Sequence, residues 1–217
     1  MNDYARITSF VRSMAKEDEG TLKEIYLDAI RRGVPVIRPE ARELLKTQLL
    51  LKKPKHVLEI GTAVGYSSIY MTEYLPEDAD VTTLELSEER VAEARSNIER
   101  MGRSSQIQVI CGDAAQTLKS LPDDTYDFAF VDAAKAQYIY YLSDVMRVLV
   151  PGGVIVSDNI LQEGEVLESH FLVEKRNRTI HDRMREYLDV LTHDERLETA
   201  ILPVGDGMAI SILLKNA

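Results

Sequence analysis

The chain contains 217 residues, of which 45% are hydrophobic and 29% charged, and its formal net charge is −10 at pH 7. This length and composition predict one globular domain with a substantial core, and the acidic balance disfavours binding of nucleic acid over the whole surface. The single cysteine excludes an internal disulfide and favours a reducing, cytoplasmic location, and the lack of an apolar run of ~18 residues excludes a membrane-spanning helix.

The first quarter of the chain has the apolar spacing of helices. Three helices are expected, over residues 2–14, 18–32 and 39–51. Gly33 and Pro35 can end the second of them, and Pro39 can begin the third. We expect residues 1–54 to form a helical cap that packs over a sheet edge, covers a ligand or makes the contact of a homodimer. The extended link before Pro39 could lay the backbone of Ile37 against that ligand.

From residue 56 onward, strand patterns alternate with helical patterns. Strands are expected at 56–60, 80–85, 106–111, 126–131 and 153–157. Helices are expected between them, at 66–75, 87–101, 114–120 and 135–149. The strands are nearly continuous runs of Val, Ile and Leu, as in parallel strands buried on both faces, and Cys111 is expected to be buried in the third. The alternation predicts an open, mostly parallel sheet with helices on both faces.

The alternation stops after residue 160. Residues 162–175 are polar and irregular, and a helix is expected over 176–191. Two β patterns, at 198–204 and 208–214, are joined by Gly205-Asp206-Gly207 and predict an antiparallel hairpin. The chain is therefore expected to be a single α/β domain over 1–217, with a core at 55–217 and a mostly parallel, seven-stranded sheet.

The turn after the first strand has the pattern of a cofactor site. It reads Glu59-Ile60-Gly61-Thr62-Ala63-Val64-Gly65, and its glycines allow a ligand to approach the backbone. The helix that follows, from about Tyr66, points free N–H groups at the same place. Glu85 ends the next strand, where an acid can accept hydrogen bonds from ribose hydroxyls. An ordinary tight turn would explain the glycines alone, but Glu59, Glu85 and Gly112-Asp113-Ala114 strengthen the cofactor interpretation.

Polar residues follow the fourth and fifth strands. Asp132 and Lys135 come after the fourth, and Asp158 and Asn159 come after the fifth. The carboxyl ends of parallel strands meet at one edge of a sheet, so these side chains should lie together. Two carboxylates and an amide suit Mg²⁺ or another hard cation, whereas zinc would require the histidines, which are scattered and expected at the surface. Each residue alone could cap a helix or start a turn; together they indicate a cation site.

These motifs, taken together, resemble those of the cation-dependent O-methyltransferases, class I enzymes that use S-adenosylmethionine (SAM) and include catechol and caffeoyl-CoA O-methyltransferases. The resemblance covers roughly residues 33–160 and the closing hairpin, and it implies a Rossmann-like fold. It implies that Asp132, Asp158 and Asn159 hold Mg²⁺ or another divalent cation. Lys135 would be the catalytic base, acting beside Asp132. The residues implied for SAM are Ile37, Glu59, Gly61, Thr62, Ala63, Gly65, Tyr66, Ser67, Glu85, Asp113, Ala114 and Asp132.

The acceptor is expected to carry a hydroxyl beside a second oxygen. Methyl transfer needs the acceptor oxygen deprotonated and in line with the methyl group, and a cation can hold two adjacent oxygens in that position. The chain has no tryptophan, and both residues between Asp132 and Lys135 are alanine, which favours an open platform over a narrow catechol slot. Small catechols and hydroxycinnamoyl-type phenols remain an alternative.

The whole-chain pattern is closest to a bacterial branch of this family that resembles the tRNA 5-hydroxyuridine methyltransferases. This resemblance implies that the chain methylates 5-hydroxyuridine at the wobble position to 5-methoxyuridine, with a tRNA anticodon loop as partner. Lys175, Arg176 and Arg178 could contact phosphates, although their spacing is equally typical of a solvated helix face. A nicotinamide-dependent oxidoreductase lacks support because Gly-x-Gly-x-x-Gly is missing, and a non-catalytic RNA-binding module would leave the polar strand ends unexplained.

Overall fold

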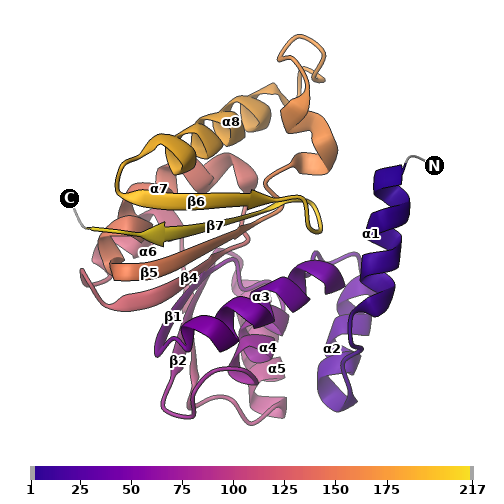
Figure 1. Cartoon of the computed structure of the whole chain (residues 1–217). Helices are drawn as coiled ribbons and strands as arrows, with labels where there is room; N and C mark the ends of the chain where they lie inside the picture. The colour runs from indigo at the N-terminus through magenta and orange to yellow at the C-terminus, as the bar shows by residue number, and fades with distance from the viewer. Residues whose placement is uncertain (1–2, 216–217) are drawn as a thin grey trace.

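A seven-stranded sheet forms the centre of the computed structural model, which describes residues 3–215 (Figure 1). The strands are β1 (His56–Ile60), β2 (Asp80–Glu85), β3 (Ile107–Cys111), β4 (Tyr126–Val131), β5 (Leu149–Asp158), β6 (Leu197–Leu202) and β7 (Met208–Leu213). Their order is β3-β2-β1-β4-β5-β7-β6. The first five run parallel, and β7 is antiparallel to both of its neighbours. The predicted mostly parallel sheet with a closing antiparallel hairpin is confirmed.

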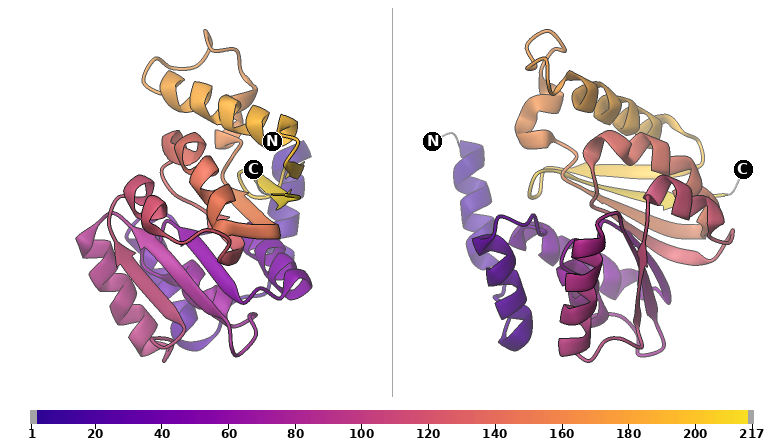
Figure 2. Two further views of the ribbon diagram at one scale, coloured as in Figure 1. Left: turned by 90° about the vertical axis from the view of Figure 1, so that its left-hand side faces the viewer. Right: turned by 180° about the vertical axis from the view of Figure 1, so that it is seen from behind.

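Helices cover both faces of this sheet (Figures 1 and 2). They are α1 (Asp3–Met14), α2 (Gly20–Arg31), α3 (Pro39–Lys52), α4 (Tyr66–Thr72), α5 (Glu88–Arg100), α6 (Ala114–Ser120), α7 (Tyr138–Val148) and α8 (Arg178–His193). Two short 3₁₀ segments, η1 (Lys135–Gln137) and η2 (Gln162–Leu167), precede α7 and α8. One apolar cluster packs helices α2, α3, α4 and α5 against one face of the sheet. Another packs helices α6, α7 and α8 against the other face. The predicted start of the first helix at residue 2 lies outside the described residues.

The structure corrects several sequence-based boundaries. The helix predicted over 135–149 begins as η1 and ends one residue before β5, whose first residue, Leu149, already pairs with Tyr126. The segment 162–175, predicted to be irregular, contains η2. Cys111 is exposed instead of buried, because β3 is the edge strand of the sheet and only part of it is covered.

The N-terminal helices are attached to the core through α3, which buries Ala41, Leu45 and Leu49. Arg12 of α1 donates two hydrogen bonds to the carboxylate of Glu40, at 2.9 and 2.8 Å. The outer side of α1 leaves apolar side chains exposed, Phe10 to 64%. The homodimer expected from these helices stays a prediction. In the described part of the chain, every helix is too short or too polar to cross a membrane.

The strand order creates a crevice beside β1. After β1, the chain first adds β2 and β3 on one side and then places β4 on the other. The connections on the two sides leave in opposite directions, so the carboxyl ends of β1, β2 and β4 border an open space. The residues predicted to bind a ligand follow these three strands.

Candidate active site

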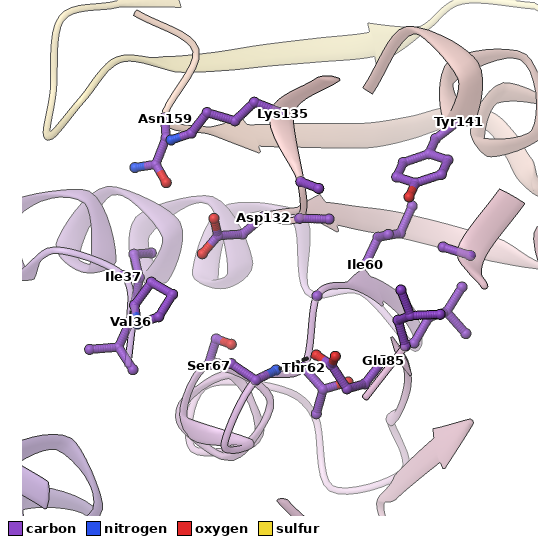
Figure 3. Close-up of a pocket in the computed structure, with 18 of the residues that line it drawn as sticks. Val36, Ile37, Ile60, Thr62, Ser67, Glu85, Asp132, Lys135, Tyr141 and Asn159 are labelled. Atoms are coloured by element: carbon purple, nitrogen blue, oxygen red, sulfur yellow. Dashed lines mark hydrogen bonds between the residues drawn. The ribbon is translucent and has the colours of Figure 1, made fainter. Parts of the chain in front are cut away.

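A cavity of about 560 Å³ opens at the carboxyl ends of β1, β2 and β4 (Figure 3). This volume suits a nucleoside-sized ligand. Of the twelve residues implied for the cofactor, ten line the cavity: Ile37, Gly61, Thr62, Ala63, Tyr66, Ser67, Glu85, Asp113, Ala114 and Asp132. Tyr141 of α7 also lines it and was missed, because an apolar helix position gives no sign that the ring reaches a cavity.

Gly61 brings the first strand end and the fourth into contact. Its φ is +106°, and a Cβ built there would lie 2.0 Å from the backbone oxygen of Asp132. The N–H of Asp132 also donates to the carbonyl of Ile60 at 3.0 Å. The absence of a side chain at Gly61 therefore fixes where the Asp132 carboxylate enters the cavity.

Replacing Gly61 by alanine should destabilise the protein much more than the same change at Gly33. Gly33 also has a positive φ, +69°, but nothing lies within 4 Å of its added Cβ. We expect Gly33→Ala to cost about 1–2 kcal/mol of unfolding free energy for the left-handed backbone. Gly61→Ala should add about 1–3 kcal/mol of overpacking. Urea denaturation of both variants measures the difference, and equal losses would contradict the close approach of Gly61 to Asp132.

Two backbone N–H groups orient the carboxylate of Glu85 so that it can accept hydrogen bonds from a diol. The N–H of Ala63 donates to its Oε2 and the N–H of Ser87 donates to its Oε1, each at 2.9 Å. Each carboxylate oxygen keeps a further lone pair, and Figure 3 shows the group at the cavity wall near Ser67 and Thr62. This arrangement fits the predicted ribose contact.

Glu59 and Gly65, which were also predicted to bind the cofactor, do not line the cavity. Glu59 lies beneath the turn and is fully buried; its Oε2 accepts hydrogen bonds from the hydroxyls of Ser68 and Thr83. Gly65 instead allows α5 to pack closely, because an added Cβ would lie 3.3 Å from Ala94. The motif spacing predicts the turn but does not show which side of it each residue faces.

Burial raises the pKa of Glu59 to about 7, above the ordinary value of 4.5. Its Oε1 has no hydrogen-bond partner among the described residues. A carboxyl whose pKa is higher in the folded state than in the unfolded chain costs stability as pH rises between the two values. A rise from 4.5 to about 7 corresponds to roughly 3 kcal/mol above pH 7.

The stability of the Glu59→Gln variant, relative to that of wild type, should therefore increase as pH rises. We expect the difference in melting temperature, variant minus wild type, to increase between pH 5 and pH 8. The exposed Glu99→Gln on α5 is the matched control and should show no such trend. A difference for Glu59→Gln that is independent of pH would contradict the raised pKa.

The three predicted metal ligands come from two adjacent strand ends. Asp132 and Asn159 line the cavity, and Asp158 lies behind them with no exposed surface. One oxygen of Asp158 accepts the N–H of Asn159 at 2.7 Å, while Oδ2 is buried without a hydrogen-bond partner among the described residues. Figure 3 shows the side chains of Asp132, Lys135 and Asn159 around one space.

Electrostatics at this position fit a bound cation. Burial raises the pKa of Asp132, and burial together with the charge of Asp132 raises the pKa of Asp158. Asp132, which is partly exposed to the cavity, and the fully buried Asp158 repel each other, and the positive charge of Lys135 offsets this repulsion only in part. An amide oxygen beside them completes a donor set that suits Mg²⁺ or another hard cation.

Asp206 is a site residue that the sequence did not reveal. It lies in the β6–β7 turn with its side chain 8% exposed, and its Oδ2 is 3.9 Å from the Nζ of Lys135. Its Oδ1 accepts the N–H of Glu163 at 2.5 Å. The Gly205-Asp206-Gly207 pattern indicated only a turn, yet this turn holds both the predicted base and the segment after β5.

A second cavity, of about 770 Å³, adjoins the first and shares Pro35, Val36, Lys135 and Asn159 with it. We call it the acceptor cavity. Its other lining residues are Ile30, Val34, Arg38, Gln162, Glu163, Glu165, Asn177, Ile180 and Asp206. Because it begins at the predicted metal ligands and base, it is where the methyl acceptor would enter.

The basic residues predicted to contact RNA lie elsewhere. Lys175, Arg176 and Arg178 are absent from the lining of both cavities. Arg176 pairs with Glu174 at 2.8 Å, and Arg178 donates to the carbonyls of Val173 and Phe171. At least two of the three therefore have partners within their own segment.

One histidine was predicted wrongly. His181 is buried, 1% exposed, and not at the surface. Its Nδ1 and the Nδ1 of His170 lie 3.1 and 2.7 Å from one oxygen of Asp182. Both imidazoles lower the pKa of Asp182 by hydrogen bonding. This cluster attaches the loop before α8 to that helix.

Known proteins resemble this chain over most of its length. The family model described as O-methyltransferase matches residues 13–214. The chain is 33% identical over 191 residues to a catechol O-methyltransferase from Niastella koreensis, covering 83% of this chain and 84% of the relative. It is 34% identical over 178 residues to a caffeoyl-CoA O-methyltransferase from Stellaria longipes, covering 78% and 73%. The solved O-methyltransferase from Bacillus cereus, in complex with S-adenosylhomocysteine (SAH), matches with a TM-score of 0.83 at 26% identity, over 96% of this chain and 97% of that one. The chain therefore belongs to the O-methyltransferase family.

Proposed function

We propose that this chain methylates a phenolic hydroxyl that stands next to a second oxygen atom, using a divalent cation. The chain is a SAM-dependent O-methyltransferase by family, which favours an enzyme over a non-catalytic RNA-binding module. The observation that supports the acceptor class is the arrangement at the boundary of the two cavities: Lys135 and Asn159 line both, and Asp132 lines the first. Asp158 lies buried directly before Asn159. Small catechols and hydroxycinnamoyl-type phenols fit this requirement, and two of the relatives carry those names.

The chain's own residues bind and orient the reactants. Glu85 would accept hydrogen bonds from the ribose hydroxyls of SAM, the group that would supply the methyl. The close packing of Gly61 fixes the floor of the cavity beside Asp132. Lys135 stands where the acceptor enters and takes the proton of its hydroxyl at Nζ. Asp132, Asp158 and Asn159 would hold a divalent cation, which would orient two adjacent acceptor oxygens and stabilise the negative charge of the deprotonated one.

The tRNA wobble nucleoside stays a prediction. A 5-hydroxyuracil has the same pair of neighbouring oxygens. The acceptor cavity carries three acids, Glu163, Glu165 and Asp206, against two bases, Arg38 and Lys135, and this balance does not favour a polyanion. The basic residues expected to hold phosphates line neither cavity. We therefore favour a small phenol.

Incubation of the enzyme with labelled SAM and Mg²⁺ tests both substrates. We expect methyl transfer to catechol and to hydroxycinnamoyl-type diols, and none to phenol, which lacks the second oxygen. EDTA should stop the reaction, and added Mg²⁺ should restore it. Label that enters hypomodified tRNA and no diol would overturn the phenol proposal and favour the wobble nucleoside.

A further inference from the structure

Gln162 has an unusual environment in the acceptor cavity. Its residue is 8% exposed, yet neither Nε2 nor Oε1 of its side-chain amide has a hydrogen-bond partner among the described residues. It lines the same cavity as Lys135 and Asn159. Buried polar atoms are normally paired, so an unpaired donor and an unpaired acceptor on one side chain point to a missing ligand.

The backbone holds this side chain in a strained position. Gln162 and Glu163 have φ values of +52° and +53°, which residues with side chains rarely adopt. Asp206 holds both flanking residues: its carbonyl accepts the N–H of Leu161 at 2.9 Å, and its Oδ1 accepts the N–H of Glu163 at 2.5 Å. An added Cβ on Gly207 would lie 2.3 Å from the Leu161 side chain, so the same turn packs closely against this segment. Backbone strain that several surrounding contacts maintain is often found at residues that contact a ligand.

We propose that Gln162 selects acceptors that carry an uncharged, amide-like group in addition to the reacting oxygen pair. Its Nε2 donates to the carbonyl of that group, and its Oε1 accepts from the N–H of the same group. Carboxamide, lactam and imide groups present this pair. A carboxylate offers no donor to Oε1, so it would leave one of the two amide atoms of Gln162 without a partner. The inference rests on the proposed phenol methylation and names the substituent that the acceptor carries.

Three catechols that differ in one substituent test the inference: 3,4-dihydroxybenzamide, 3,4-dihydroxybenzoate and 4-methylcatechol. Two neutral hydrogen bonds correspond to roughly a tenfold to hundredfold preference in kcat/KM for the amide over the methyl compound. In Gln162→Leu, which keeps the size but removes both polar atoms, the preference should fall to about threefold or less. Gln162→Glu keeps an acceptor and loses the donor, so its preference should lie between these values.

Gln48→Leu on α3, outside both cavities, is the matched control and should keep the wild-type preference. Gln162→Leu should not lower the melting temperature, because it removes two unpaired buried atoms. A wild type without preference for the amide, or a preference that survives in Gln162→Leu, overturns the inference and leaves the proposed function intact. If calorimetry with SAH-loaded enzyme shows no binding of any of the three catechols, and none is methylated, the proposed function fails and this inference with it.

Discussion

Replacing Asp158 by asparagine is expected to abolish methyl transfer and to make the metal-free protein more resistant to heat. Asp158 is fully buried beside Asp132, and its Oδ2 has no hydrogen-bond partner among the described residues. The substitution removes one of the two anionic donors that we propose for the cation. Loss of a group that merely supports a ligand costs 10- to 100-fold, so turnover should fall by more than about 100-fold.

The expected gain in stability of metal-free Asp158→Asn follows from the burial of Asp158. The pKa of Asp158 is raised in the folded protein, so the metal-free wild type loses stability as pH rises above about 4, the ordinary value for aspartate. Asparagine carries no charge and does not incur this loss. We expect the melting temperature of metal-free Asp158→Asn to exceed that of wild type, by an amount that grows between pH 5 and pH 8.

Scanning calorimetry in EDTA and labelled-SAM assays measure the two effects. Asp189→Asn on α8, an aspartate whose side chain is 74% exposed, is the control and should change neither turnover nor the melting temperature appreciably. An Asp158→Asn enzyme that keeps full, EDTA-sensitive turnover would show that the cation is held elsewhere. A variant that melts well below wild type in EDTA would contradict the repulsion between the two carboxylates.

The sheet could be predicted from sequence because its strands are distinct. Runs such as Phe128 to Val131 are buried on both faces, and each is followed by a helix with amphipathic spacing. The Rossmann-like α/β fold, the seven strands and the closing hairpin are all confirmed. The grouping of the proposed metal ligands could be predicted for a related reason: carboxyl ends of parallel strands meet, so Asp132 and Asn159 had to lie at one edge.

Residues that reach the site through long-range packing could not be predicted. Asp206 and Glu163 are 43 residues apart, and their contact depends on how β7 pairs with β5. Nothing in the turn pattern around Asp206 indicates that it faces Lys135. Orientation was likewise hidden for Tyr66, which lines the cofactor cavity while its hydroxyl donates to Asp18 at 2.6 Å.

Replacing Lys135 by methionine should lower kcat by about 10²- to 10⁴-fold, the contribution of a positioned general base. Lys135 lines both cavities, its side chain is 29% exposed, and its Nζ is 3.9 Å from Asp206. Methionine keeps the length and apolar stem of the side chain, so SAH should bind with an affinity within about tenfold of wild type. Lys119→Met, on the exposed end of α6, is the control and should keep full turnover.

An acceptor with a more acidic hydroxyl distinguishes a base from a residue that only positions the substrate. A nitrocatechol is largely ionised at pH 8 and needs no group to take its proton, whereas catechol does. If Lys135 acts as the base, Lys135→Met should lose far less turnover with the nitrocatechol than with catechol, because the step that Lys135 assists is already complete. Equal losses with both acceptors would assign Lys135 to positioning through Asp206, and another group would have to remove the proton.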